Sequence, residues 1–181
     1  MAVRKGLARL IPAISLPTVS YDAYEDGYVI RNNQDLAKLF KPKVALIGMP
    51  GAFFPSTQHR LLPEYLTIQQ EIKTLGGIQH IFILSVNDPY VLQEFAEEID
   101  AEERFSYIAD YAGSVATALG ASHDFQGFGT RCRAFSCVVE ESKVTLLAVE
   151  PDWRISKVSR AQSLLNRLSP YIPYPGTVYN N

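Results

Sequence analysis

Two short apolar segments restrict the fold more than any other feature of the sequence. Val44–Met49 lies between Lys41-Pro42-Lys43 and Pro50-Gly51, and Ile81–Val86 follows Gly76-Gly77. Apolar runs of about four to eight residues between turn signals are typical of strands that are buried on both faces. Buried strands that alternate with helical segments form parallel pairs joined by right-handed crossovers. The sequence therefore predicts an α/β protein with parallel central strands.

Helical spacing and capping residues define the other elements. The helix Leu62–Leu75 is predicted to bury one face, formed by Tyr65, Ile68, Ile72 and Leu75. Further helices are predicted over Gln34–Phe40 with Asn33 as N-cap, over Tyr90–Ile99 with Asp88 as N-cap, over Gly113–Leu119, and over Val158–Leu168 with Ser156 or Ser159 as N-cap. A strand over Phe105–Ala109 and a hairpin of Phe135–Val139 with Val144–Val149 complete the order. This order predicts a thioredoxin-like three-layer α/β sandwich with a central mixed sheet.

Length and charge limit the domain organisation and the partners. We expect one domain over residues 11–168, between a basic extension at residues 1–10 and a Pro/Tyr-rich tail at residues 169–181. The formal net charge of −2 gives no field that would attract nucleic acid or an anionic membrane. No apolar run reaches the roughly 20 residues of a membrane-spanning helix. The sequence thus predicts neither nucleic-acid contact nor a transmembrane segment.

The start of the chain is basic. It contains Arg4, Lys5 and Arg9, and no acidic residue precedes Asp22. Such a start is typical of mitochondrial presequences, and equally of a basic surface tail. A cleaved presequence would be short, because fold-like sequence begins near Ile11. The expected location is the mitochondrion, with the cytoplasm as the alternative.

The segment after Val44–Met49 is where a fold of this kind places a reactive group. Ligands in open α/β sheets lie beyond the carboxyl ends of the strands, and the following helix N-terminus stabilises anions. Here the segment is Pro50-Gly51-Ala52-Phe53-Phe54-Pro55-Ser56-Thr57. It resembles the Pro-Gly-Ala-Phe-Thr-Pro-x-Cys segment of the type-five peroxiredoxins, within the redoxin group.

The resemblance continues in a consistent order from about Ile11 to Leu168. The other matching segments are Leu84–Asp88, Ala109-Asp110 with Gly113, Ala118–Gly120, Phe135–Val139, Val149–Pro151 and Ser159–Leu165. The resemblance implies the peroxiredoxin type of thioredoxin fold. It also makes a homodimer plausible, because members of that family often form dimers.

The same resemblance implies that the peroxidase site is degenerate. The family's peroxidatic thiol falls on Thr57, its supporting Thr on Phe54 and its active-site Arg on Ala134, whereas Pro50 is retained. Peroxide reduction requires a thiolate that becomes a sulfenic acid, and a Thr hydroxyl cannot follow this chemistry. Phe54 is expected to fill the peroxide pocket. We therefore expect no catalytic residue at this site and an inactive relative of the enzymes.

Cys132 and Cys137 are the two cysteines of the chain. Cys137 alternates with apolar residues in a strand and is expected to be a buried filler. Cys132 lies between Arg131 and Arg133, which are expected to lower its pKa and leave an accessible redox thiol. Arg133 is also a candidate substitute for the family's active-site Arg. The alternative function is therefore a thiol-based redox protein that uses Cys132.

The favoured function is a structural or accessory subunit of a larger, possibly mitochondrial, assembly. The tail carries Tyr171, Tyr174 and Tyr179 among prolines, and such residues suit a protein interface. A disordered tail is the competing interpretation. The scattered His59, His80 and His123 lack metal-ligand spacing, and neither a metal nor a cofactor is predicted.

Overall fold

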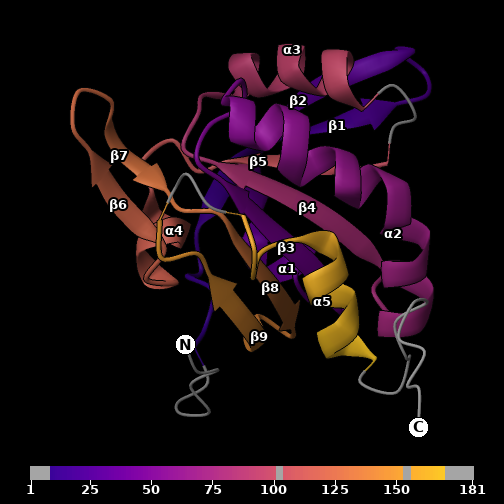
Figure 1. The fold of residues 1–181 in the computed structure, drawn as a ribbon. Coiled ribbons are helices and arrows are strands. Elements are labelled where there is room, and N and C mark those ends of the chain that lie inside the picture. The colour runs from indigo at the N-terminus through magenta and orange to yellow at the C-terminus, as the bar shows by residue number, and fades with distance from the viewer. Residues whose placement is uncertain (1–8, 101–103, 153–155, 170–181) are drawn as a thin grey trace, which may run out of the picture.

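A seven-stranded mixed sheet forms the centre of the protein (Figure 1). The computed structural model describes residues 9–100, 104–152 and 156–169. The strand order is β2-β1-β5-β4-β3-β8-β9. The strands are β1 (Ser15–Asp22), β2 (Gly27–Asp35), β3 (Val44–Met49), β4 (His80–Ser85), β5 (Ser106–Ala109), β8 (Phe135–Glu140) and β9 (Lys143–Val149). β3, β4 and β5 pair in parallel, and the remaining neighbours pair in antiparallel.

Helices cover both faces of this sheet, so the fold has three layers. One face packs against α2 (Leu62–Gly76), α3 (Pro89–Ile99) and α5 (Ala161–Leu168). The other face packs against α1 (Leu36–Leu39), α4 (Ser114–Ala118) and part of the hairpin formed by β6 (Ser122–Phe125) and β7 (Gly129–Cys132). The predicted thioredoxin-like three-layer sandwich with a mixed sheet is confirmed.

β3 is the strand that joins the two cores. Ala45, Ile47 and Met49 point into one core, and Val44 and Leu46 point into the other. All five side chains are fully buried. Successive side chains of a strand alternate between its faces, so a strand covered on both sides must be apolar at every position. This explains the continuous apolar run in the sequence.

The predicted cap and start of the first helix are wrong. Asn33 lies within β2 with a φ of 53°, and β2 continues to Asp35, which pairs with Ser15. Asp35 is the true N-cap, because its Oδ1 accepts a hydrogen bond from the Ala37 amide at 2.9 Å. Pairing with β1 therefore takes two residues from the predicted helix.

The final helix also begins later than predicted. α5 starts at Ala161, with Arg160 and not Ser156 or Ser159 as the N-cap. Ser159 is engaged elsewhere, because its amide and its Oγ both donate to Glu150 Oε1, at 2.8 and 2.9 Å. The buried Glu150 carboxylate thus holds the chain in a non-helical turn just before α5.

The predicted buried face of α2 is correct at Tyr65 and Ile72 but wrong at Leu75, which is 45% exposed. Ile68 is half-buried against the core and has non-helical backbone angles (φ −113°, ψ 17°). After it, Ile72 and Gly76 are the buried positions of the helix. Gly77 ends the helix in the left-handed conformation, as Gly76-Gly77 predicted.

The β6–β7 hairpin was not predicted from the sequence. Most residues of its two short strands are polar or exposed, so no apolar run or regular alternation marks them. The turn passes through Gly127 at a φ of 87°, a conformation that favours glycine. Since the hairpin projects from the body of the sheet, it forms a wall beside the carboxyl edge of β3 (Figure 1).

Arg9, Leu10 and Ile11 are attached to the body of the domain. The Arg9 guanidinium donates a hydrogen bond to the Leu119 carbonyl at the end of α4. Leu10 forms a bridge with Lys143 at the start of β9, and the Ile11 amide donates to the Ser142 carbonyl at 2.9 Å. These contacts attach the N-terminal segment to two separate parts of the domain.

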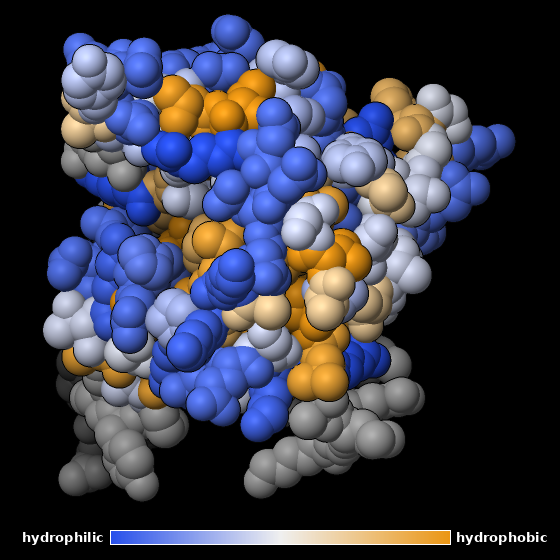
Figure 2. Space-filling view, turned by 180° about the vertical axis from the view of Figure 1, so that it is seen from behind, coloured by the Kyte–Doolittle hydropathy of each residue, from blue (hydrophilic) through white to orange (hydrophobic). Residues whose placement is uncertain are grey.

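The surface opposite to the view of Figure 1 is mostly hydrophilic, with hydrophobic residues in separate patches (Figure 2). In the part of the chain that the structure describes, no helix has the length and apolar character needed to cross a membrane.

Replacing Gly48 should strongly destabilise the fold. A Cβ at this position of β3 would lie 2.1 Å from the buried Phe135 ring of the neighbouring strand. We expect Gly48→Ala to lower the free energy of unfolding by about 1–3 kcal/mol or more, measured by urea denaturation. Gly27→Ala is the matched control, because its Cβ would meet its nearest atom at an ordinary 3.5 Å. Equal losses in the two variants would contradict the close approach of Gly48 and Phe135.

Candidate functional site

The loop after β3 is fixed against the end of β4. Pro50, Gly51 and Ala52 are all buried, and the Ala52 amide donates to Asn87 Oδ1 at 3.1 Å. The same oxygen accepts a hydrogen bond from Ser85 Oγ at 2.6 Å. The loop therefore has a defined position at the carboxyl edge of the parallel strands, where α/β folds place their ligands.

Phe53 and Phe54 leave this loop in different directions. The Phe53 ring meets the buried Phe95 ring of α3 edge to face, with centroids 5.2 Å apart. The Phe54 ring packs over Gly51, where a Cβ would come within 2.8 Å of it. Phe54 also contacts Phe128 of the β6–β7 turn edge to face at 6.2 Å. Phe54 thus bridges the loop and the hairpin.

Thr57 begins η1 (Thr57–Leu61), a π-helical turn that leads directly into α2. Its side chain is fully buried, and its amide donates to the Phe54 carbonyl at 2.8 Å. Among the described residues, its Oγ1 has no hydrogen-bond partner. Burial of a hydroxyl without a partner costs about 1–3 kcal/mol, so this position is poorly suited to the residue that occupies it.

The side chain of Ala134 is a methyl group, which cannot bind an anion. It is 3% exposed and belongs to the same apolar core as Ala52 and Leu61. The guanidinium of the neighbouring Arg133 is bound elsewhere, because its Nη2 donates to the Gly120 carbonyl at 2.7 Å. Arg131 donates from Nη1 to the Val86 carbonyl at 2.8 Å. Both guanidinium groups are therefore bound to backbone carbonyls.

The structure contradicts the expectation that Cys132 is accessible. Cys132 and Cys137 are both fully buried in the core on the sheet face that α1, α4 and the β6–β7 hairpin cover. Burial and the Asp110 carboxylate raise the pKa of the Cys132 thiol well above its ordinary value, and Arg133 opposes this only in part. Burial likewise raises the pKa of Cys137. The two flanking arginines therefore do not produce a thiolate, since desolvation outweighs them. Cys137 is the buried filler that its strand pattern predicted.

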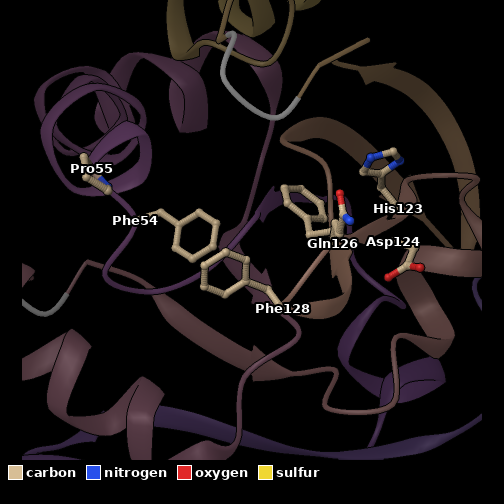
Figure 3. Close-up of a pocket in the computed structure, with 7 residues that line it drawn as sticks. Phe54, Pro55, His123, Asp124, Gln126 and Phe128 are labelled. Carbon is tan, nitrogen blue, oxygen red and sulfur yellow. The ribbon is translucent and has the colours of Figure 1, made fainter.

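A pocket of about 500 Å³ opens between the β3–η1 loop and the β6–β7 hairpin (Figure 3). Its wall is formed by Phe54, Pro55, His123, Asp124, Phe125, Gln126 and Phe128. Phe54 forms one side of this open space. Thr57 and Ala134 are not part of its wall, so the expectation that Phe54 fills a peroxide pocket at Thr57 stays a prediction. The pocket residues of the hairpin were missed because the hairpin itself was missed. Phe125 and Phe128, two aromatic residues on either side of a glycine turn, were the available signal.

The metal site and the two chain ends remain to be described. Among the described residues, no group of three or more His, Cys, Asp or Glu side chains is arranged to hold a metal ion. Tyr171, Tyr174 and Tyr179 lie outside the described residues, as do Arg4 and Lys5. Their expected roles stay predictions.

Comparison with known proteins supports the fold. The profile of the Redoxin family matches residues 10–165. Peroxiredoxin-2C of Oryza sativa subsp. japonica is 31% identical over 128 residues, which cover 70% of this chain and 78% of that protein. The mitochondrial Peroxiredoxin-2F of Arabidopsis thaliana is 29% identical over 136 residues, with 74% and 67% covered. The crystal structure of reduced Prx3 from Vibrio vulnificus superposes with a TM-score of 0.74 at 29% identity and covers 93% of this chain and 98% of that one.

A mixed sheet with a buried loop and helix at the carboxyl end of β3 defines a thioredoxin-like protein of the redoxin class. The chain belongs to the redoxin family, and relatives at about 30% identity are peroxiredoxins. The name peroxiredoxin is that of the relatives. The residues at this chain's own site are Pro50, Phe54, Thr57 and Ala134.

The native protein should be resistant to thiol reagents. We expect Cys132 and Cys137 to react with Ellman's reagent at pH 8 at least about a hundredfold more slowly in the folded protein than in urea, because reaction requires opening of the core. A Thr74→Cys variant supplies an exposed thiol on α2 as the matched control. Rapid labelling of Cys132 in the native protein would contradict its burial. It would favour the alternative function, a thiol-based redox protein that uses Cys132.

Proposed function

We propose that this protein is a type-five peroxiredoxin relative without peroxidase activity, which serves as a structural or accessory subunit of a larger assembly. The observation that carries the proposal is Thr57, a buried hydroxyl at the start of η1, where the resemblance to the type-five enzymes expects the peroxidatic thiol. A hydroxyl is not ionised at neutral pH and forms no sulfenic acid.

The surroundings of Thr57 support the loss of activity independently. Peroxide reduction depends on groups that stabilise a thiolate and orient the peroxide. Phe54 presents an apolar ring, Ala134 presents a methyl group, and the guanidinium groups of Arg131 and Arg133 donate to backbone carbonyls. The residues at the positions that the resemblance assigns to the family's hydroxyl donor and cation, Phe54 and Ala134, thus supply neither group.

An accessory role is the function that best fits a retained fold without its reactive group. The sheet, both cores and the β3–η1 loop are intact, and folds are kept for their surfaces as well as for their chemistry. The tail with Tyr171, Tyr174 and Tyr179 is the proposed contact to protein subunits, and a homodimer is the simplest alternative assembly. The basic N-terminal residues and the mitochondrial relative favour a mitochondrial location.

The competing function is a thiol-based redox protein that uses Cys132. Full burial and a raised pKa oppose this function, because the reacting species would have to be an exposed thiolate. We therefore favour the accessory role.

Restoring the nucleophile alone should not restore a peroxidase. We expect Thr57→Cys to consume hydroperoxide, with dithiothreitol as reductant, within about tenfold of the unchanged protein. The new thiol would be buried with no hydrogen-bond donor, so its pKa would rise and not fall. Substantial turnover by this single variant would contradict our account of the site.

A matched series separates the missing groups. Phe54→Thr combined with Thr57→Cys restores the hydroxyl donor, and the further change Ala134→Arg restores the cation. We expect the triple variant to exceed Thr57→Cys by about 10²-fold or more, because one fixed electrostatic group contributes about 10²–10³ in rate. Circular dichroism identifies any variant that does not fold.

The native size of the protein tests the accessory role directly. In a gently solubilised extract we expect it to migrate with a large assembly and to be much larger than its 20.2 kDa chain mass. Co-migrating proteins identified by mass spectrometry would name the partners. Migration only as a free monomer would contradict the proposal, and deletion of residues 170–181 tests whether the tail makes the contact.

A further inference from the structure

We propose that the pocket between the β3–η1 loop and the β6–β7 hairpin binds a small planar aromatic ligand that carries a positive charge. This function is separate from the accessory role. The pocket wall includes Phe54 but neither Thr57 nor Ala134. Thr57 is not part of the pocket wall, so the site does not use the position at which we expect the family's nucleophile.

The shape and size of the pocket suit a small molecule. Its volume of about 500 Å³ lies within the range of roughly 300–1,000 Å³ that is usual for ligand sites. Two independent parts of the fold form it, because Phe54 and Pro55 come from the loop after β3 and the other wall residues come from the hairpin. The packing of Phe54 against Phe128 holds these two parts together at one end.

The walls of the pocket are aromatic. Figure 3 shows the rings of Phe54 and Phe128 next to each other, with His123 and Asp124 at the end away from Pro55. The His123 ring meets Phe125 edge to face at 5.0 Å, which adds a second aromatic pair. Phe128 is 64% exposed despite its large apolar surface. A planar ring that enters the pocket would cover this surface and stack against the aromatic walls.

The charge of the pocket selects a cation. Asp124 is its carboxylate, and no Lys or Arg side chain belongs to its wall. Within the described part of the chain, the structure assigns Asp124 neither an ion pair nor a side-chain hydrogen bond. Arg131, which pairs with His123 across the hairpin, keeps its charge but is not part of the pocket wall, and its guanidinium is held by the carbonyls of Val86 and Phe128. Aromatic faces also attract cations, so the rings and the carboxylate favour the same sign of charge.

The probe that tests this proposal is benzamidinium, which combines a flat ring with a delocalised positive charge. We expect saturable binding by isothermal titration calorimetry, with amide chemical-shift changes at residues 54 and 123–128. Benzoate has the same shape and the opposite charge, and it should bind at least about tenfold more weakly. Methylguanidinium has the charge without the ring and should also bind more weakly, which distinguishes an aromatic cation from an arginine side chain.

Two substitutions assign the affinity to the pocket. Asp124→Asn and Phe128→Ala should each weaken benzamidinium binding by about threefold or more. The matched controls are Glu94→Gln on α3 and Tyr90→Ala, which remove an exposed charge and an exposed ring outside the pocket wall and should leave binding unchanged. Benzoate binding as tight as benzamidinium, or no saturable binding of benzamidinium by the folded protein, would overturn the proposal. Neither result bears on the native size that tests the accessory role.

Discussion

The burial of β3 on both faces is the constraint on which the rest of the molecule depends. This strand contributes to two cores at once and lies between β4 and β8 in the sheet. The neighbouring strand β8 approaches β3 so closely that a side chain at Gly48 would clash with the buried Phe135 ring. A strand held in this way gives its outgoing loop a fixed origin. The positions of Phe54 and Thr57, and of the pocket beside them, follow from where β3 ends.

Sequence patterns were most informative where a segment's structure depends on its own residues. The apolar runs of β3 and β4 and the Asp88 cap of α3 could be predicted, because burial on two faces and N-cap hydrogen bonds leave local signals. The ends of α1 and α5 could not be predicted in the same way. They depend on β1 pairing with β2 and on Glu150 binding Ser159, and these contacts join residues that are distant or not regularly spaced.

The candidate site also has features that the sequence could predict and others that it could not. The resemblance to a peroxiredoxin loop pointed to Thr57, Phe54 and Ala134 from the sequence, and their roles stay predictions. The structure shows that Thr57 and Ala134 are buried. The chemistry of Cys132 could not be read from its neighbours in the sequence. Arg131 and Arg133 flank it along the chain, but a strand turns adjacent side chains in opposite directions, and burial then decides the pKa. The pocket could not be predicted either, because most of its wall comes from the β6–β7 hairpin, whose polar strands show no regular apolar pattern.

The attachment of Arg9 and Leu10 sets a limit on maturation of the chain. These residues bind α4 and β9, two elements that are separate in sequence. A protease that removes residues before Arg9 leaves these contacts in place. Cleavage after Leu10 would remove an arginine from the end of α4 and free the adjoining edge of β9. These contacts therefore make Arg9 and Leu10 part of the folded domain, whichever compartment the protein enters.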